Sequence, residues 1–354
     1  MTKSKPSAEL TQRAHQLLQL LVLEYIRTGL PVGSKRLASL HQEGISPATI
    51  RALMARLEQA GFLNQPHTSA GRVPTSKAIQ FHVDGLERIP DLPNRQVARI
   101  REMLEQETDP GDLMIQTSQI LSRLSNNLGF VMAPPQSVSV LKRIEFVRIS
   151  SRRILAILVT RAGLVQSRLI ATGRRLSQED LDRAGLCLQD QFEGQTLSQI
   201  RRELRRLESR TAQDSRPRND AIRLGTASLV RSRRNPGSDS QVYFGGTSRL
   251  LRQPELNDQD RAAGLFRTME KKSRLAEVLI ERLDADQPAP SVTLDLDRHI
   301  PEMRGWAMIS SPYLYRERVA GSLGILGPRR MKYDRGISLV GYVARLFGQI
   351  LSGA

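Results

Sequence analysis

Apolar residues near the start of the chain recur at the spacing of a helix with one buried side. Over residues 10–27 these positions are Ala14, Leu17, Leu18, Leu21 and Tyr25, which fall on one face. Gly29 and Pro31 predict the end of this helix, because glycine adopts a left-handed cap and proline cannot continue the helix. A short second helix is expected over 35–40, with Ser34 as its N-terminal cap.

A third helix is expected over 47–60, with Ser46 as its cap and Pro47 in its first turn. Its apolar face, which should pack on the first helix, carries Ile50, Leu53, Met54 and Leu57. Its opposite face is small and basic, with Ala48, Ala52, Ala55, Gln59, Arg51 and Arg56. Small side chains let a helix approach a partner closely, and arginines reach phosphates or guanine edges. Alanine is also the best helix former, but helices with these connections are typical of DNA-binding proteins.

Residues 64–75 are rich in proline, serine and glycine and predict a hairpin after the third helix. Such a hairpin would be the wing of a winged helix, and its tip would contact the DNA backbone or a minor groove. The candidates at the tip are His67, Thr68, Ser69 and Arg72. His67 is equally compatible with an exposed loop histidine, since no second metal ligand stands at suitable spacing beside it.

Past residue 85 helical and strand patterns alternate. A linker is expected at 89–94, where two prolines interrupt regular structure. Helical patterns are expected at 95–124, 177–235, 258–283 and 337–351, and strands at 129–133, 141–149, 154–160, 164–170, 241–244, 292–296, 306–310 and 323–326. Residues 324–328 are expected to turn tightly from strand to helix, with Met331 and Tyr333 packed behind. This order predicts an α+β multidomain protein whose mixed domain is interrupted by a mostly helical insertion.

Charge favours a polyanionic partner. Lys and Arg number 53 against 36 acidic residues, a net charge of +17, so nucleic acid is the first candidate and an anionic membrane surface the second. An arginine-rich proteome would produce the same excess. Cys187 is the single cysteine, which excludes a disulfide framework or a cysteine metal cluster. The lack of an 18-residue apolar run argues against a membrane span, and the lack of an apolar segment at the start argues against a secretory signal. We therefore expect a cytoplasmic protein, with no membrane among its partners.

Five segments resemble the HrcA family of heat-inducible transcription repressors. They are 31–35 (PVGSK), 46–51 (SPATIR), 66–75 (PHTSAGRVPT), 246–255 (GTSRLLRQPE) and 324–333 (GILGPRRMKY). The resemblance implies a winged helix, a GAF-like domain and a dimerising domain inserted within it. It also implies a homodimer on double-stranded DNA with an inverted-repeat operator upstream of chaperone operons of the groE and dnaK type. Finally, it implies dependence on the GroEL chaperonin, with activity lost on heating or when chaperonin is scarce.

The expected organisation is a winged helix–turn–helix DNA-binding domain at 1–85, a linker at 86–94, a GAF-like domain at 95–170 and 241–354, and the inserted dimerising domain at 171–240. The expected DNA contacts are Ser34, Lys35, Ser46, Pro47, Ala48, Thr49, Arg51, Ala52, Arg56, His67, Thr68, Ser69, Arg72 and Thr75. The family usually has asparagine where this chain has Ala52. Because asparagine reads adenine with two hydrogen bonds and alanine does not, we expect an altered operator preference or readout by other residues.

Other classes of function find less support. Asp295, Asp297 and His299 could suggest a metal site along a strand, but nearby partners are lacking. No nucleophile elbow, phosphate loop or zinc signature occurs, so we expect neither an enzyme nor a bound cofactor or metal. A ligand-gated regulator would require a pocket in the GAF-like domain. An RNA-binding protein would use the arginine-rich helices at 200–234, which lack interleaved aromatic residues for base stacking.

Overall fold

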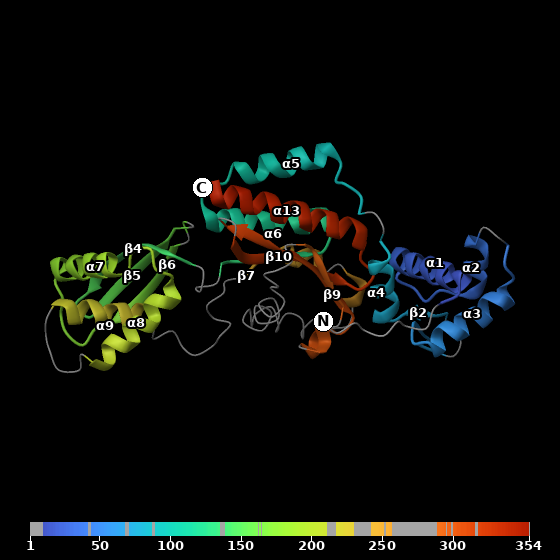
Figure 1. The fold of residues 1–354 in the computed structure, drawn as a ribbon, viewed down its shortest axis with the longest axis horizontal. Helices are drawn as coiled ribbons and strands as arrows, with labels where there is room; N and C mark the ends of the chain where they lie inside the picture. Colours follow the sequence, from blue (N-terminus) through green and yellow to red (C-terminus); the bar gives the residue numbers. More distant parts are fainter. Residues whose placement is uncertain are drawn as a thin grey trace.

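The computed structural model arranges the chain as three units in a row (Figure 1). We call them the N-terminal unit (10–86), the central unit (89–134 and 242–353) and the insertion (139–229). The described residues are 10–41, 44–67, 71–86, 89–134, 139–161, 163, 165–210, 217–229, 242–250, 253–256, 289–294, 296–298, 300–315 and 318–353. The helix expected over 258–283 therefore lies outside the described residues. Within the described part, no helix is both long and apolar enough to span a membrane.

The N-terminal unit packs helices against a small antiparallel sheet. Its elements are α1 (Gln12–Thr28), α2 (Ser34–Leu40), α3 (Pro47–Gln59), β1 (Leu63–Asn64), β2 (Val73–Pro74) and α4 (Ser76–Asp84). Thr11 caps α1, and Gly29 ends it in the left-handed conformation at φ 70°. The predicted cap of α2 is wrong: Gly33 is the capping residue, and Ser34 is the first residue of the helix.

The central unit is built on the antiparallel sheet β7-β3-β10-β9-β8. Its strands are β3 (Leu128–Met132), β7 (Val242–Gly245), β8 (Ser291–Thr293), β9 (Trp306–Tyr315) and β10 (Arg318–Pro328), and its long helices are α5 (Asn94–Glu105), α6 (Pro110–Ser125) and α13 (Tyr333–Gly353). The short helices are α10 (Thr247–Leu250), η2 (Pro254–Leu256), η3 (Leu296–Arg298) and η4 (Pro301–Met303). In Figure 1, α6 and α13 lie along one side of the sheet, with α5 beyond them.

Side chains along the central strands point alternately to the two faces of the sheet and so contribute to two separate cores. Val131 and Ile325 belong to the cluster shared with α6 and α13, whereas the neighbouring Phe130 and Leu326 belong to a cluster on the other face. As predicted, Met331 and Tyr333 are buried, both in the cluster with α13.

The predicted turn at 324–328 is wrong, because these residues continue β10 to Pro328. Their glycines permit close packing of the strand. A side chain on Gly324 would lie 2.1 Å from the carbonyl oxygen of Ile309, and one on Gly327 would lie 2.1 Å from Asn127. These two glycines suggested a turn in the sequence, but in the structure they let the strand pack closely against Ile309 and Asn127.

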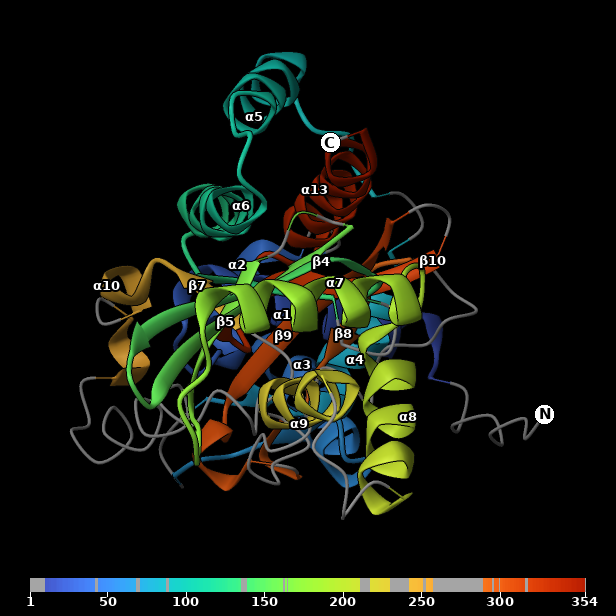
Figure 2. The same ribbon diagram turned by 90° about the vertical axis from the view of Figure 1, so that its left-hand side faces the viewer.

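The insertion contains a three-stranded antiparallel sheet, β4-β5-β6, covered on one face by helices (Figure 2). Its elements are β4 (Leu141–Ser150), β5 (Arg153–Thr160), β6 (Val165–Ala171), α7 (Gln178–Phe192), α8 (Leu197–Arg210) and α9 (Pro217–Leu229). Inward residues of β4 and β5, such as Ile144 and Leu158, share one cluster with Leu188 of α7 and Leu224 of α9. Strands that we expected in the GAF-like part before residue 170 thus pack with the helices that follow them.

The other face of this sheet is apolar and exposed. Its apolar outward residues, which alternate with the inward set, are Val147, Ile149, Leu155, Ile157, Val159, Val165 and Leu169. The three in β5 are half-buried, and Arg143, Glu145 and Ser167 share this face by register. Val165 is 60% exposed and Leu169 is 53% exposed. A sheet face of this composition is unusual on a surface that only meets water.

Candidate nucleic-acid interface

Helix α3 is formed and oriented by the residues predicted for it. The Ser46 hydroxyl accepts a hydrogen bond from the Thr49 amide at 3.2 Å, and Pro47 occupies the first turn. Ile50, Met54 and Leu57 are buried in the cluster of the N-terminal unit. Burying this stripe turns the opposite face of α3 outward.

The outward face of α3 combines small residues with unpaired cations. Ala48, Thr49, Arg51, Ala52, Ala55, Arg56 and Gln59 are all exposed. Neither Arg51 nor Arg56 forms an ion pair with any described residue, and the same holds for the exposed Lys35 of the adjoining α2. These cations can meet an external anion without the loss of an ion pair to any described residue.

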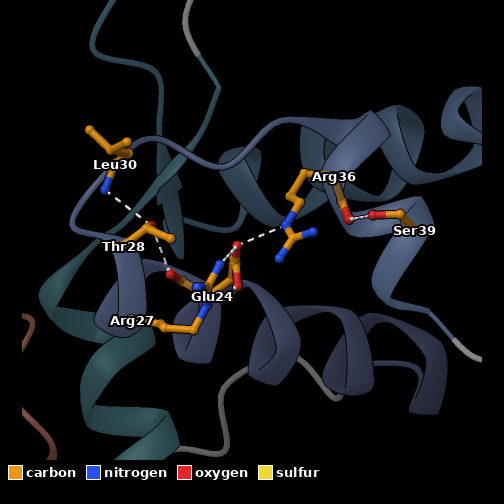
Figure 3. A network of polar contacts seen from close by, with 6 residues as sticks. All are labelled: Glu24, Arg27, Thr28, Leu30, Arg36 and Ser39. Atoms are coloured by element: carbon orange, nitrogen blue, oxygen red, sulfur yellow. Dashed lines mark hydrogen bonds and ion pairs between the residues drawn. The ribbon is translucent and has the colours of Figure 1, made fainter.

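A buried carboxylate fixes α2 on α1 (Figure 3). Glu24, with only 8% of its side chain exposed, accepts bonds from Arg27 at 2.7 and 2.9 Å and from Arg36 of α2 at 2.9 Å. Hydrogen bonds from Arg27 and Arg36 lower the pKa of Glu24 to about 2, against the opposing effect of burial. Thr28 and Leu30 close the end of α1, since the Thr28 hydroxyl donates to the Glu24 carbonyl and accepts from the Leu30 amide.

The hairpin β1–β2 is held to α3 and to the loop before α2. Arg72 Nε lies 2.9 Å from Glu58 Oε2 of α3, as an ion pair rather than an aligned hydrogen bond. The backbones of Arg72 and Val32 exchange hydrogen bonds at 2.8 and 2.9 Å. A side chain on Gly71 would lie 2.5 Å from the Val32 carbonyl carbon, so only glycine permits this approach. The arginine predicted at the hairpin thus has an internal role in placing it.

The remaining predicted contacts divide into exposed and structural positions. His67 is exposed, Ser34 and Pro47 are half-buried, and Thr68 and Ser69 lie outside the described residues. The Thr75 hydroxyl donates to the carbonyls of Gly61 and Phe62 and accepts from the Ala78 amide at the start of α4. Thr75 therefore joins β2 to α4.

Asp297 is the one described residue of the three considered for a metal site, and it does not lie on a strand. Strand β8 ends at Thr293, and Asp297 lies in the short helix η3, 3.7 Å from Arg329. The strand expected over 292–296 is thus present but ends earlier than expected, and Asp295 and His299 lie outside the described residues. Among the residues that are described, no group of His, Cys, Asp and Glu could hold a metal ion.

Comparison with known proteins decides the family. The family model described as the HrcA protein C terminal domain matches residues 111–337. The heat-inducible transcription repressor HrcA of Geobacter sulfurreducens is 35% identical over 98% of this chain and 99% of its own length. That of Xanthomonas campestris is 35% identical over 98% of this chain and 97% of its own.

The chain belongs to the HrcA family. This family consists of transcription repressors and not of enzymes. A crystal structure described as that of a hypothetical protein matches with a TM-score of 0.63 and 21% identity, over 98% of this chain and 99% of the other. That likeness shows a shared fold across all three units.

Sequence reasoning missed the residues that position the candidate interface. Glu24 and Arg27 stand three positions apart on one helix, a spacing that signals a contact. Arg36 forms an ion pair with the same carboxylate although it lies twelve positions further along the chain. Glu58 and Arg72, which form another ion pair, are fourteen positions apart. No local pattern indicates those two pairs, because they exist only once the helices and the hairpin have packed.

Proposed function

We propose that this HrcA-family protein represses heat-shock chaperone operons of the groE and dnaK type by binding an inverted-repeat operator as a homodimer. In this proposal the N-terminal unit is a winged helix, with α3 in the major groove and the β1–β2 hairpin as its wing. The observation that carries it is the outward face of α3, where Arg51 and Arg56 have no ion pair with a described residue. Binding DNA neutralises them without breaking any internal contact.

In this proposal the residues that contact DNA directly are mainly the exposed ones. Arg51, Arg56 and Lys35 bind phosphates or guanine edges, while Ala48 and Ala52 let the helix backbone come close to the groove. Thr49 and the exposed His67 complete the direct contacts, together with Thr68 and Ser69. Ser34, Ser46, Pro47, Arg72 and Thr75 act mainly by holding the interface in shape.

The central unit is the GAF-like domain of this proposal, and residues 86–94 are its linker to the DNA-binding domain. We place the start of the dimerising domain before β4 rather than at residue 171. The support is the shared cluster of β4, β5 and β6 with α7, α8 and α9, and the separation of this sheet from the five-stranded one.

The outward face of β4-β5-β6 suits a second copy of this chain. A palindromic operator presents two equivalent half-sites, which a dimer with two-fold symmetry matches. Changing Leu169, which is 53% exposed on this face, to Glu should shift the protein from dimer to monomer in sedimentation equilibrium. The matched control is Leu186→Glu on α7, at a side chain that is 63% exposed. A Leu169→Glu protein that stays dimeric would contradict this face as the dimer contact.

Heat sensitivity follows from folding in this proposal. Heat, or a shortage of the GroEL chaperonin, lowers the fraction of folded dimer and releases the operator. The amount of operator-binding protein recovered from denaturant should rise when GroEL and its nucleotide are added. Equal recovery with and without GroEL would count against chaperonin dependence.

The choice between DNA and RNA is tested by salt titration with duplex DNA and RNA of equal length. We expect tighter binding to duplex DNA, with an affinity that falls steeply as salt rises because counterions are released from the phosphates. Arg51→Ala should weaken DNA binding, and Arg99→Ala, at an exposed arginine of α5, should not. Tighter binding to RNA would overturn the proposed function.

A further inference from the structure

The N-terminal unit touches the central unit at two places. Ile79 of α4, with Val83 and Leu86 packed beside it, belongs to the apolar cluster of the central unit. The end of α1 makes the second contact. Gly29, the left-handed cap of α1, lies against the side chain of Arg330 in the turn after β10. A methyl group at Gly29 would be 2.9 Å from Cδ of Arg330 and 3.1 Å from its Nε. The arginine therefore fills the space beside the helix end that the glycine leaves open.

Arg330 is held in place by two residues from a distant segment. Its Nε donates to Glu255 Oε1 at 2.5 Å, and its Nη2 donates to Glu255 Oε2 at 3.1 Å and to Gln253 Oε1 at 3.3 Å. Gln253 is itself buried and donates to the carbonyl of Asn126, the cap of α6. Such a two-point contact uses the planar guanidinium, which lysine cannot reproduce.

Apolar contacts and charge surround this ion pair. Ile26 of α1 packs against both the cluster of the N-terminal unit and that of the central unit. Tyr25 lies within electrostatic reach of the pair: burial raises its pKa, Glu255 raises it further, and Arg330 lowers it. Arg330 and Glu255 are only 23% and 27% exposed. Water therefore competes little with the contact.

We propose that Glu255 holds Arg330 against the end of α1, and that this contact, together with that of α4, fixes the orientation of the N-terminal unit on the central unit. The fixed orientation sets the half-site spacing that the dimer accepts. This inference rests on the proposed binding of an inverted repeat. Two copies of α3 reach both half-sites only if each N-terminal unit points in one direction. Without Arg330 the unit keeps the α4 contact but loses its second fixed point. Its direction must then be ordered during binding, which weakens binding to the full site and relaxes the spacing requirement.

The test compares three duplexes: a single half-site, the full inverted repeat, and the repeat with two base pairs added between its half-sites. In the unaltered protein, the added base pairs should weaken binding strongly. In Arg330→Lys and Glu255→Gln, half-site affinity should stay within about twofold, while full-site affinity falls about tenfold. The penalty for added base pairs should shrink in both variants.

Arg183→Lys is the matched control, since its ion pair with Asp180 is exposed and lies in the insertion. It should keep the full-site affinity and the spacing penalty of the unaltered protein. Circular dichroism and sedimentation must show folded dimers for every variant. A variant that loses half-site and full-site affinity equally, or keeps the full spacing penalty, would overturn the positioning role.

Failure of this inference differs from failure of the proposed function. If the unaltered protein does not prefer the inverted repeat to scrambled DNA, the proposed function is wrong, and this inference falls with it. If the preference is present but the Arg330 and Glu255 variants keep the spacing penalty, only the positioning role is wrong.

Discussion

Arginines serve two different purposes in the N-terminal unit and at its junction with the central unit. Arg51 and Arg56 on α3 are exposed and have no ion pair with a described residue, whereas Arg72 and Arg330 are partly buried and paired with Glu58 and Glu255. Cations of the first kind attract a polyanion, and those of the second kind position the groups that meet it. The net charge of +17 does not separate the two kinds; the pairing pattern does.

The largest effect should follow from removing both unpaired cations of α3. Arg51→Ala combined with Arg56→Ala should weaken operator binding about 100-fold, since each contact contributes on the order of 1–2 kcal/mol. Thermal stability should stay unchanged, because both side chains are exposed and have no ion pair within the part of the chain that the structure describes. Mobility-shift titration and thermal denaturation measure the two properties. A double variant that binds within twofold of the unaltered protein would remove α3 from the interface.

The next largest effect should follow from a substitution at Gly71, where the hairpin lies close to the backbone of Val32. Gly71→Ala should destabilise the protein by about 1–3 kcal/mol, because its methyl group would overlap the backbone of Val32. Gly173→Ala is the control, at a site with nothing within 4 Å. Urea denaturation followed by circular dichroism compares the two. Equal midpoints would show that the hairpin does not depend on contact with Val32.

A smaller effect distinguishes the two possible roles of Arg72. If Arg72 positions the hairpin through Glu58, then Arg72→Ala and Glu58→Gln should both weaken operator binding about fivefold, the consequence of losing roughly 1 kcal/mol. If Arg72 instead contacts DNA directly, Glu58→Gln would leave affinity unchanged or raise it. Titration of the two variants side by side decides between positioning and contact.

The last prediction concerns how stability depends on acid pH. The pKa of Glu24 falls from its ordinary value of 4.5 to about 2 in the folded protein, so its ionised form favours folding. The stabilisation is fully present above about pH 4.5 and is lost as the pH falls toward about 2. The stability difference between the unaltered protein and Glu24→Gln should therefore shrink over that range. A difference that is constant with pH would show that the Glu24 charge plays no part.

Local signals in the sequence predicted the elements of the interface well. Ser46 and Pro47 predicted the start of α3, and Gly29 predicted the end of α1, because caps depend on the residue at one position and its near neighbours. The outward face of α3 also followed from periodicity alone. These features need no knowledge of what packs on them.

Features that depend on distant partners could not be predicted. The strands at 141–171 were expected from alternation, but alternation does not tell which helices cover them, and they pack on α7 and α9 rather than on the central unit. The glycines at 324 and 327 suggested a turn, whereas neighbouring strands and Asn127 require them to lack side chains. The pair of Arg330 with Glu255 joins segments 75 positions apart.

The most direct test of the account is a mobility-shift titration of the refolded protein on a duplex with the family's inverted repeat, against a scrambled duplex as competitor. We predict a shifted band that persists in excess scrambled DNA, with the half-saturation point moved to much higher concentration by Arg51→Ala. A band that scrambled DNA abolishes as readily as the repeat would contradict a sequence-specific repressor and leave only charge-driven binding.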